Sequence, residues 1–194
     1  GKTFDRSVLE DVKQFLTDQY YSRGKYGVLI DTKVEEQPGN RVKINSMAYI
    51  CNAVTIEDGV MISAGTIFTN DRFPRATTPD LKELRSSDPD EHTLATVVRE
   101  GATIGAGCIV GCNLEIGRWA MIGMGSIVTK SVPDFCLAIG TPARVIGVVC
   151  RCGEPVHRFS EGDNATPVEA TCQCGRSYSI NGHVVTEIET PVAV

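Results

Sequence analysis

The sequence predicts an all-β protein whose main domain is a parallel β-helix, a solenoid that coils around a triangular prism. The first observation is an aliphatic residue at every sixth position from residue 98 to residue 128, a period that neither a helix nor a single strand has. Glycine follows four of these six residues and permits the backbone conformation of a corner. Three such hexads make one coil, with the aliphatic side chains inside the prism. The six positions are Val98, Ile104, Val110, Ile116, Ile122 and Val128.

The second observation is the same six-residue phase upstream, at Ile44, Ile50, Ile56, Ile62 and Phe68. We therefore expect one solenoid that is interrupted once, by a polar insertion at about residues 69–97. Long insertions without secondary structure are uncommon in compact domains and are more often functional than decorative. The insertion is the place where we expect a functional site.

The third observation is a change of composition on either side of the solenoid. Residues 7–22 read as an amphipathic helix that opens with a capping box at Ser7 and Glu10, and such a helix would cover the open end of the prism. The segment after residue 148 is rich in cysteine and alternating apolar residues. The predicted organisation is a helix and cap at 1–43, the β-helix at 44–148 and a small subdomain at 149–194.

Eight cysteines fall into two groups. Four lie within or beside the hexads, where they act most simply as small apolar fillers, and four form the pairs Cys150/Cys152 and Cys172/Cys174, separated by nineteen residues. Four thiolates around one Zn²⁺ would hold together a segment too small to build its own core, as in a zinc ribbon. Only one residue separates the members of each pair, fewer than is usual, so reduced cysteines in a hairpin are the alternative. His157 and His183 are possible substitute ligands.

Charge and hydropathy exclude some classes of protein. The net charge of −5 argues against bulk binding to nucleic acid, which needs a basic surface. No run of residues is long and apolar enough to span a bilayer, and the first thirty residues carry charges where a secretory signal needs an apolar stretch. We therefore expect a cytoplasmic protein with neither a membrane nor a nucleic acid as partner.

Two further segments carry a family resemblance. Residues 123–133 (GMGSIVTKSVP) and 140–144 (GTPAR), together with the hexads, resemble the hexapeptide-repeat acyltransferases over residues 44–149. The resemblance implies a left-handed coil, which the general right-handed rule for parallel crossovers would not predict. It also implies a homotrimer, acetyl-CoA as donor and active sites between neighbouring prisms. Residues 68–75 (FTNDRFPR) and 96–105 (TVVREGATIG) are similar to the branch that N-acetylates nucleotide-linked amino sugars, especially 3-amino sugars of surface polysaccharides.

Within the insertion, Asn70 suits N-acetylation because its side-chain oxygen can accept a hydrogen bond from the attacking amine, where the resemblance also places it. A turn residue is the alternative. Arg72 and Arg75 match the phosphates of a sugar nucleotide, although either can pair with a nearby carboxylate. Asp71 is a further substrate-binding or proton-accepting candidate. His92 is the candidate catalytic base, needed if the acceptor is a hydroxyl, and a solvated loop histidine is the alternative.

The resemblance also implies where coenzyme A lies, along the prism toward its C-terminal end. Glycines are required for the corners of this fold anyway, and surface Lys and Arg are usually only solvated, so a structural role is the alternative for each. The implied positions are Gly105, Gly123, Gly125, Lys130 and Arg144.

Three functions are consistent with these observations. The first is an acetyl-CoA-dependent N-acetyltransferase of a nucleotide-linked amino sugar. The second is an O-acetyltransferase of a sugar or small alcohol, with His92 as base. The third is a non-catalytic scaffold whose cysteine-rich segment binds another macromolecule.

Overall fold

A computed structural model describes residues 41–86, 88–160 and 167–188, all within a compact unit that spans residues 39–194. The helix expected at 7–22 lies outside the described residues. All regular secondary structure in the described part of the chain is β-strand, which confirms the all-β prediction. None of the described residues forms a helix with the length and apolar character that crossing a membrane requires.

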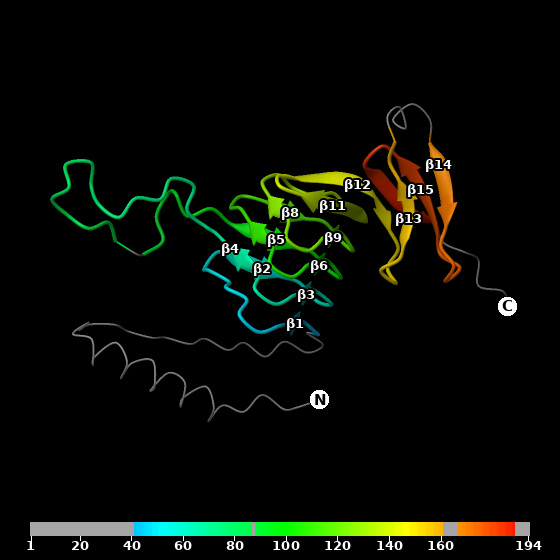
Figure 1. Cartoon of the computed structure of the whole chain (residues 1–194), viewed down its shortest axis with the longest axis horizontal. Coiled ribbons are helices and arrows are strands. Elements are labelled where there is room, and N and C mark those ends of the chain that lie inside the picture. The colour runs from blue at the N-terminus through cyan, green and yellow to red at the C-terminus, as the bar shows by residue number, and fades with distance from the viewer. Residues whose placement is uncertain (1–40, 87, 161–166, 189–194) are drawn as a thin grey trace, which may run out of the picture. The chain divides into compact units, whose positions relative to one another are not determined.

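Ten short strands build a three-walled solenoid of parallel strands (Figure 1). One wall contains β1, β3, β6 and β9, the second β4, β7 and β10, and the third β2, β5 and β8, so the chain visits the walls in rotation. Tyr49 and Val132 take wall positions through isolated parallel bridges. The strands are β1 (Lys43–Ile44), β2 (Val54–Ile56), β3 (Met61–Ile62), β4 (Ile67–Phe68), β5 (Thr96–Val98), β6 (Thr103–Ile104), β7 (Ile109–Val110), β8 (Glu115–Ile116), β9 (Met121–Ile122) and β10 (Ile127–Val128).

The strand register shows that the two hexad arrays form one solenoid. Ile44 pairs with Ile62 and Ile104 with Ile122, so one coil takes 18 residues, or three hexads. Ile62 pairs with Ile104 in the same wall, 42 residues away. The insertion between β4 and β5 therefore adds 24 residues to one coil without shifting the phase of the repeat. The prediction of one interrupted solenoid is confirmed.

Most hexad residues form the core, and Ile50 and Ile56 are partly buried against it. The six aliphatic residues from Val98 to Val128 are at most 1% exposed, and Ile62 and Phe68 are fully buried. Ile44, however, is 51% exposed, so the expectation that it points into a closed prism is wrong. The physical reason is its place in β1, which within the described residues pairs with a strand on one side only.

The chain leaves the solenoid through antiparallel strands. β11 (Cys136–Gly140) lies parallel to β9, and β12 (Ala143–Val149) and β13 (Pro155–Arg158) follow antiparallel in the same sheet, across the subdomain boundary expected from the sequence. A second sheet contains β14 (Val168–Thr171), β15 (Ser177–Asn181) and β16 (Val184–Ile188) (Figure 1). A second apolar cluster joins both parts through Phe135, Val148 and Tyr178.

Two glycines test how tightly the coils stack. A Cβ added at Gly105 would lie 2.5 Å from the backbone nitrogen of Met124 in the next coil, whereas one at Gly107 would meet nothing within 4 Å. We expect Gly105→Ala to cost about 3 kcal/mol or more of unfolding free energy, because backbone must move. Gly107→Ala should cost about 1 kcal/mol, since only its positive φ of 68° opposes a side chain. Urea unfolding measures both, and equal losses would contradict the stacking argument.

Candidate active site at the neck of the insertion

The insertion leaves and re-enters the solenoid at one point, which we call the loop neck. Asp71 and Thr93 form an antiparallel bridge across it, and the backbone N–H of Leu94 donates to the carbonyl of Asn70 at 2.8 Å. The backbone N–H of Arg72 also donates to the carbonyl of His92 at 3.4 Å. The residues that enter and leave the loop therefore lie side by side above the end of β4.

Arg85 connects the two sides of the loop neck through ion pairs and a hydrogen bond. Its guanidinium contacts the Asp90 carboxylate at 2.8 Å and the Asp71 carboxylate at 3.7 Å, and it donates to the carbonyl of Phe73 at 3.1 Å. The side chain is 23% exposed, which makes it the most enclosed charged group of the loop's ion pairs. Because one cation joins both sides of the neck, the loop has a defined conformation although it contains no regular strand.

An open cleft of about 360 Å³ lies at the loop neck. Asn52, Asn70 and Asp71 line it from the solenoid side, and the loop contributes Arg75 and Arg85. We call it the neck cleft. Asp88 and Asp90 also line the cleft, so it presents both signs of charge and suits a polar ligand.

The side-chain amide of Asn70 is oriented by Asn52. The Nδ2 group of Asn70 donates to the Oδ1 atom of Asn52 and, at 3.4 Å, to its backbone carbonyl. A backbone carbonyl can only accept, so the NH₂ group of Asn70 must face Asn52. The Oδ1 atom of Asn70 is therefore turned away from Asn52 and is available to accept a hydrogen bond.

The two candidate phosphate ligands keep their charge available. The Arg72 guanidinium lies over the ring of Phe73, 5.7 Å from its centroid, and that of Arg75 donates to the carbonyl of Pro74. Among the described residues, no carboxylate forms an ion pair with either side chain. Three carboxylates of the loop, those of Asp71, Asp80 and Asp90, pair instead with Arg85 or Lys82, so the alternative that Arg72 or Arg75 serves a loop ion pair does not apply to this conformation.

The candidate base His92 lies beside the neck cleft rather than in it. Its ring packs edge-on against Phe73, with centroids 6.0 Å apart, and its Nε2 lies 3.9 Å from a Glu91 carboxylate oxygen. It lines a neighbouring hollow with Phe73, Arg75 and Arg85. The structure thus brings Asn70, Asp71 and Arg75 together at the neck cleft, whereas His92 lines the neighbouring hollow.

The neck also contains a carboxylate whose titration is measurable. The backbone N–H of His92, and then the Arg85 guanidinium, lower the pKa of Asp90 below its ordinary value of 3.8. A lowered pKa in the folded state means that this contact is intact above the ordinary value and is lost as the pH falls through the lowered one. We expect the NMR shift of the His92 amide proton to titrate with a midpoint below 3.8. A midpoint at or above this value would contradict the contact, and Asp90→Asn should abolish the titration.

The residues expected to bind coenzyme A are spread along the solenoid. A Cβ at Gly105 would meet the backbone of the next coil, and one at Gly123 would meet the side chain of Ile139. Gly125 has a positive φ of 69° at a corner with open space around it. Coil stacking and corner geometry thus account for the three glycines, while Lys130 and Arg144 are exposed. None of the five lines the neck cleft.

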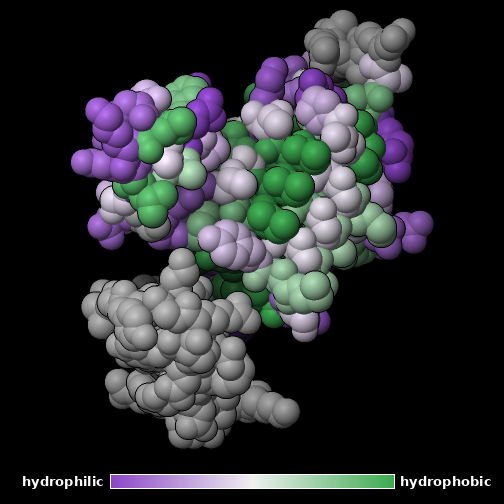
Figure 2. Space-filling model, turned by 60° about the vertical axis from the view of Figure 1, so that its left-hand side comes forward, coloured by the Kyte–Doolittle hydropathy of each residue, from purple (hydrophilic) through white to green (hydrophobic). Residues whose placement is uncertain are grey.

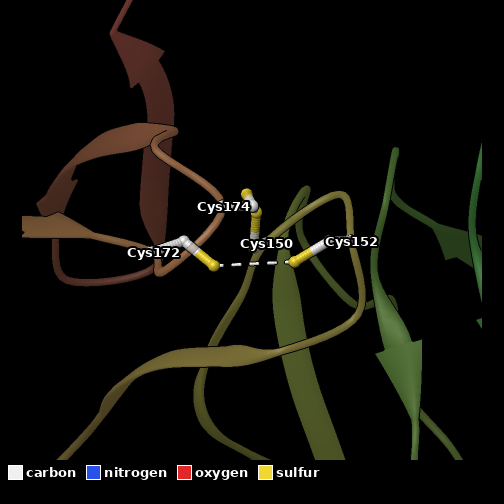
Figure 3. Close-up of side chains that lie close together, drawn as sticks. All are labelled: Cys150, Cys152, Cys172 and Cys174. Atoms are coloured by element: carbon white, nitrogen blue, oxygen red, sulfur yellow. Dashed lines mark hydrogen bonds between the residues drawn. The ribbon is translucent and has the colours of Figure 1, made fainter.

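The two cysteine pairs converge at a second place, in the turns after β12 and β14 (Figure 3). The Sγ atoms of Cys150, Cys152, Cys172 and Cys174 all lie within 4.8 Å of one another, and His157 and His183 do not join this group. The backbone N–H of Arg176, and then the Cys150 thiol, lower the pKa of the Cys174 thiol to about 6. The two pairs thus form one cluster in space.

Sequence reasoning missed two residues of the loop neck. Asn52 lies 18 residues before Asn70, and since one coil takes 18 residues it occupies the same corner one coil earlier. The coil period was therefore a signal that pointed to it. Arg85 lies in a charged run, and no spacing or motif distinguishes it from its neighbours.

Comparison with known proteins gives several relatives, although no family model matches the chain. The dTDP-3-amino-3,6-dideoxy-α-D-galactopyranose 3-N-acetyltransferase of Aneurinibacillus thermoaerophilus is 40% identical over 93 residues, 48% of this chain and 45% of that protein. A serine acetyltransferase of Salmonella typhimurium is 30% identical over 128 residues, 66% of this chain and 46% of the relative. Among solved structures, a maltose O-acetyltransferase from Clostridium difficile 630 has a TM-score of 0.49 and 25% identity over 58% of each chain.

The chain spans less than half of the length of the two curated relatives. Their identity to it confirms the resemblance to the hexapeptide-repeat acyltransferases. Within that class, the 40% identical relative also confirms the resemblance to the branch that acts on amino sugars carried on nucleotides.

Proposed function

We propose that this protein is an acetyl-CoA-dependent N-acetyltransferase that acts on the amino group of a nucleotide-linked amino sugar, a 3-amino sugar used for surface polysaccharides. The observation that carries the proposal is the oriented Asn70 amide at the loop neck, beside two arginines that form no ion pair with a carboxylate of the described residues. The 40% identical relative, named as a 3-N-acetyltransferase of a dTDP-linked amino sugar, supports the substrate class. The left-handed coil implied by the resemblance belongs to the same proposal.

In the proposed reaction, Asn70 holds the acceptor amine by accepting a hydrogen bond from its N–H. Acetyl-CoA supplies an activated thioester. The amine lone pair forms the new C–N bond, the C–S bond breaks, and the sulfur leaves with the bonding electrons. The proton lost by the nitrogen goes to that sulfur through solvent, so coenzyme A departs as a thiol. A neutral amine needs positioning more than it needs a base, which is the work that a fixed amide can do.

The charge pattern of the loop matches the rest of the proposed acceptor. Arg75 lines the neck cleft, and Arg72 lines a different hollow, on the side of Thr69 and Gly111. Asp71 lines both the cleft and this second hollow. A guanidinium presents a planar fork of donors that fits phosphate oxygens. We therefore assign the diphosphate of the sugar nucleotide to these two arginines, and a sugar hydroxyl to Asp71. Backbone groups near the three solenoid glycines, with Lys130 and Arg144, would hold coenzyme A.

The wall of β4, β7 and β10 supports a homotrimer. Hydrophobic side chains gather on one exposed face of the molecule (Figure 2). Ile67, Ile109 and Ile127 stand directly above one another on this wall, and the first two are 41% and 38% exposed. Tyr49 extends the line by one coil. An unbroken apolar ladder of this kind marks a protein interface, and we assign it to neighbouring copies of the chain.

The experiment that tests the function is release of free thiol from acetyl-CoA with a panel of dTDP- and UDP-linked amino sugars. Turnover that requires an amino sugar establishes the reaction and identifies the acceptor. Binding of coenzyme A without turnover on any amino sugar would refute the acceptor class. Failure to bind coenzyme A, measured by calorimetry, would refute acyl transfer and leave a non-catalytic scaffold.

A second candidate function is O-acetylation of a sugar or small alcohol, which the similarity to a serine acetyltransferase favours. A hydroxyl keeps its proton at neutral pH, so this reaction needs a base, and His92 is the candidate. Adding L-serine and maltose to the acceptor panel tests it. Activity on a hydroxyl that His92→Gln removes almost completely would support O-acetylation, whereas a mild loss on an amino sugar would support N-acetylation.

A further inference from the structure

We propose that Cys150, Cys152, Cys172 and Cys174 bind one structural Zn²⁺ that fastens the C-terminal sheet to the end of the solenoid. The site lies in the turns after β12 and β14, whereas the proposed acyl transfer takes place at the loop neck. The proposal therefore does not depend on the acyltransferase function.

The two turns that carry the cysteines have the same hydrogen bonds. In the first, the N–H of Cys150 donates to the carbonyl of Glu154 and the N–H of Gly153 donates back to the carbonyl of Cys150. In the second, Cys172 bonds Arg176 and Gly175 bonds Cys172 in the same pattern. The two glycines have positive φ angles of 95° and 90°. A single intervening residue thus produces a repeated thiol-bearing turn at the tip of each hairpin, so the short spacing is no obstacle to a metal site.

The sulfur positions fit a tetrahedral ion. Four sulfurs at about 2.3 Å from Zn²⁺ lie about 3.8 Å from one another. Here the Sγ atoms of Cys150 and Cys174 are 3.4 Å apart, those of Cys152 and Cys172 are 3.5 Å apart, and all four lie within 4.8 Å. The cysteines are not joined by disulfides. Each turn thus contributes one buried and one exposed thiol, an arrangement that closes a small site at the protein surface.

Donors surround the sulfurs as they surround the ligands of a structural metal. The buried hydroxyl of Tyr178 donates to the Sγ atom of Cys150 at 3.1 Å, and the Arg176 guanidinium approaches the Sγ atom of Cys174 at 3.6 Å. Four thiolates around a divalent cation carry a net charge of −2, which such donors stabilise. A purely apolar role for the cysteines would not explain why charged and hydroxyl groups face their sulfurs.

A short chain of contacts connects the cluster to the solenoid. Arg151, between the first two cysteines, lies over the ring of Trp119 at 4.9 Å from its centroid and pairs with Glu187 at 2.7 Å. Arg176, next to the second turn, pairs with the same carboxylate at 3.3 Å. Glu187 thus connects the two turns, and the contact between Arg151 and Trp119 packs the first turn against a corner of the solenoid. An ion that fixes both turns would hold this contact in place.

Metal analysis of the purified chain tests the binding. We expect about one zinc per chain, falling below about 0.1 in Cys152→Ser/Cys174→Ser, because thiolate ligands carry the affinity. These two thiols are exposed, so the change leaves the buried cluster intact, and Cys112→Ser is the matched control in the solenoid. Replacement by Co²⁺ gives a check that needs no variant, since four thiolates produce intense charge-transfer absorption. Zinc-free protein, iron in place of zinc, or cobalt without that absorption would overturn the proposal.

The fastening role has a separate readout, because Trp119 is the only tryptophan of the chain. Removal of zinc by a chelator under reducing conditions should shift its emission to longer wavelength and open the C-terminal sheet to proteolysis, and zinc should reverse both. Arg151→Gln should shift the Trp119 emission while zinc stays bound. Arg158→Gln, at an exposed position of β13, is the control. An unchanged emission and digestion pattern after complete zinc loss would show that the ion does not fasten the sheet.

Discussion

Asn70→Ala is expected to lower kcat on an amino sugar about 100-fold while the KM for acetyl-CoA changes little. The side chain touches the attacking amine in the proposed complex and not the donor, so its loss affects positioning of the nucleophile. Positioning and proton-transfer contributions of single side chains typically amount to about 10² to 10⁴ in rate. Steady-state kinetics of thiol release measure the effect, and a variant that keeps more than about a third of the activity contradicts the assignment.

Asn52 sharpens this test because it acts through Asn70. Asn52→Ala leaves the amide of Asn70 in place but removes the side-chain oxygen that accepts a hydrogen bond from its NH₂ group. The backbone carbonyl of residue 52 remains as the second acceptor. We expect a loss of about tenfold in kcat, equivalent to about 1.4 kcal/mol, which should not add to that of Asn70→Ala in the double variant. Asn45→Ala, which changes an asparagine outside the neck cleft, is the matched control. Additive losses would show that the two residues work independently.

Ile109→Glu is expected to convert the proposed trimer into single chains and to abolish activity with it. Ile109 is the middle residue of the apolar ladder, so a carboxylate there would be buried without a partner when copies meet. Because the family resemblance implies active sites between neighbouring prisms, dissociation should remove nearly all turnover. Light scattering combined with size exclusion gives the mass, and circular dichroism shows whether the solenoid stays folded.

The control for this experiment is a substitution on a second wall of the same solenoid. Thr55 is exposed on the wall of β2, β5 and β8, where Val97 and Glu115 stand above it in place of isoleucines. Thr55→Glu introduces the same charge and should leave both mass and activity unchanged. A folded Ile109→Glu variant that keeps the mass of three chains would move the interface to another face.

The sequence predicted the fold well because a solenoid repeats one local rule. Each hexad needs an inward aliphatic residue and a corner, so the pattern is visible without knowledge of distant contacts, and the pairing of Val98 with Ile116 follows from it. The exposure of Ile44 did not follow, since burial at the first strand depends on what covers the end of the coil. The antiparallel exit through β11 and β12 lies outside the repeat, so its pairing had no periodic signal.

The candidate site was less predictable, because it lies where the six-residue repeat is interrupted. Asn70 and Asp71 lie where the repeat breaks and were accessible to chemical reasoning, and the cysteines were accessible through their pairing in sequence. Arg85 was not, because its role depends on how a loop of irregular backbone brings Asp71 and Asp90 to one guanidinium. Irregular loops lack a period, so only the folded conformation selects one arginine among several.

The unchanged register on both sides of the insertion has a consequence for how such proteins are altered. Ile62 and Ile104 meet in the wall as they would in consecutive coils, so the 24 extra residues contribute no step to the wall itself. If the proposed function holds, acceptor recognition is carried by a segment that is inserted into the solenoid at a single corner. We therefore expect that segments of other lengths and sequences can replace it without disturbing the coils above and below.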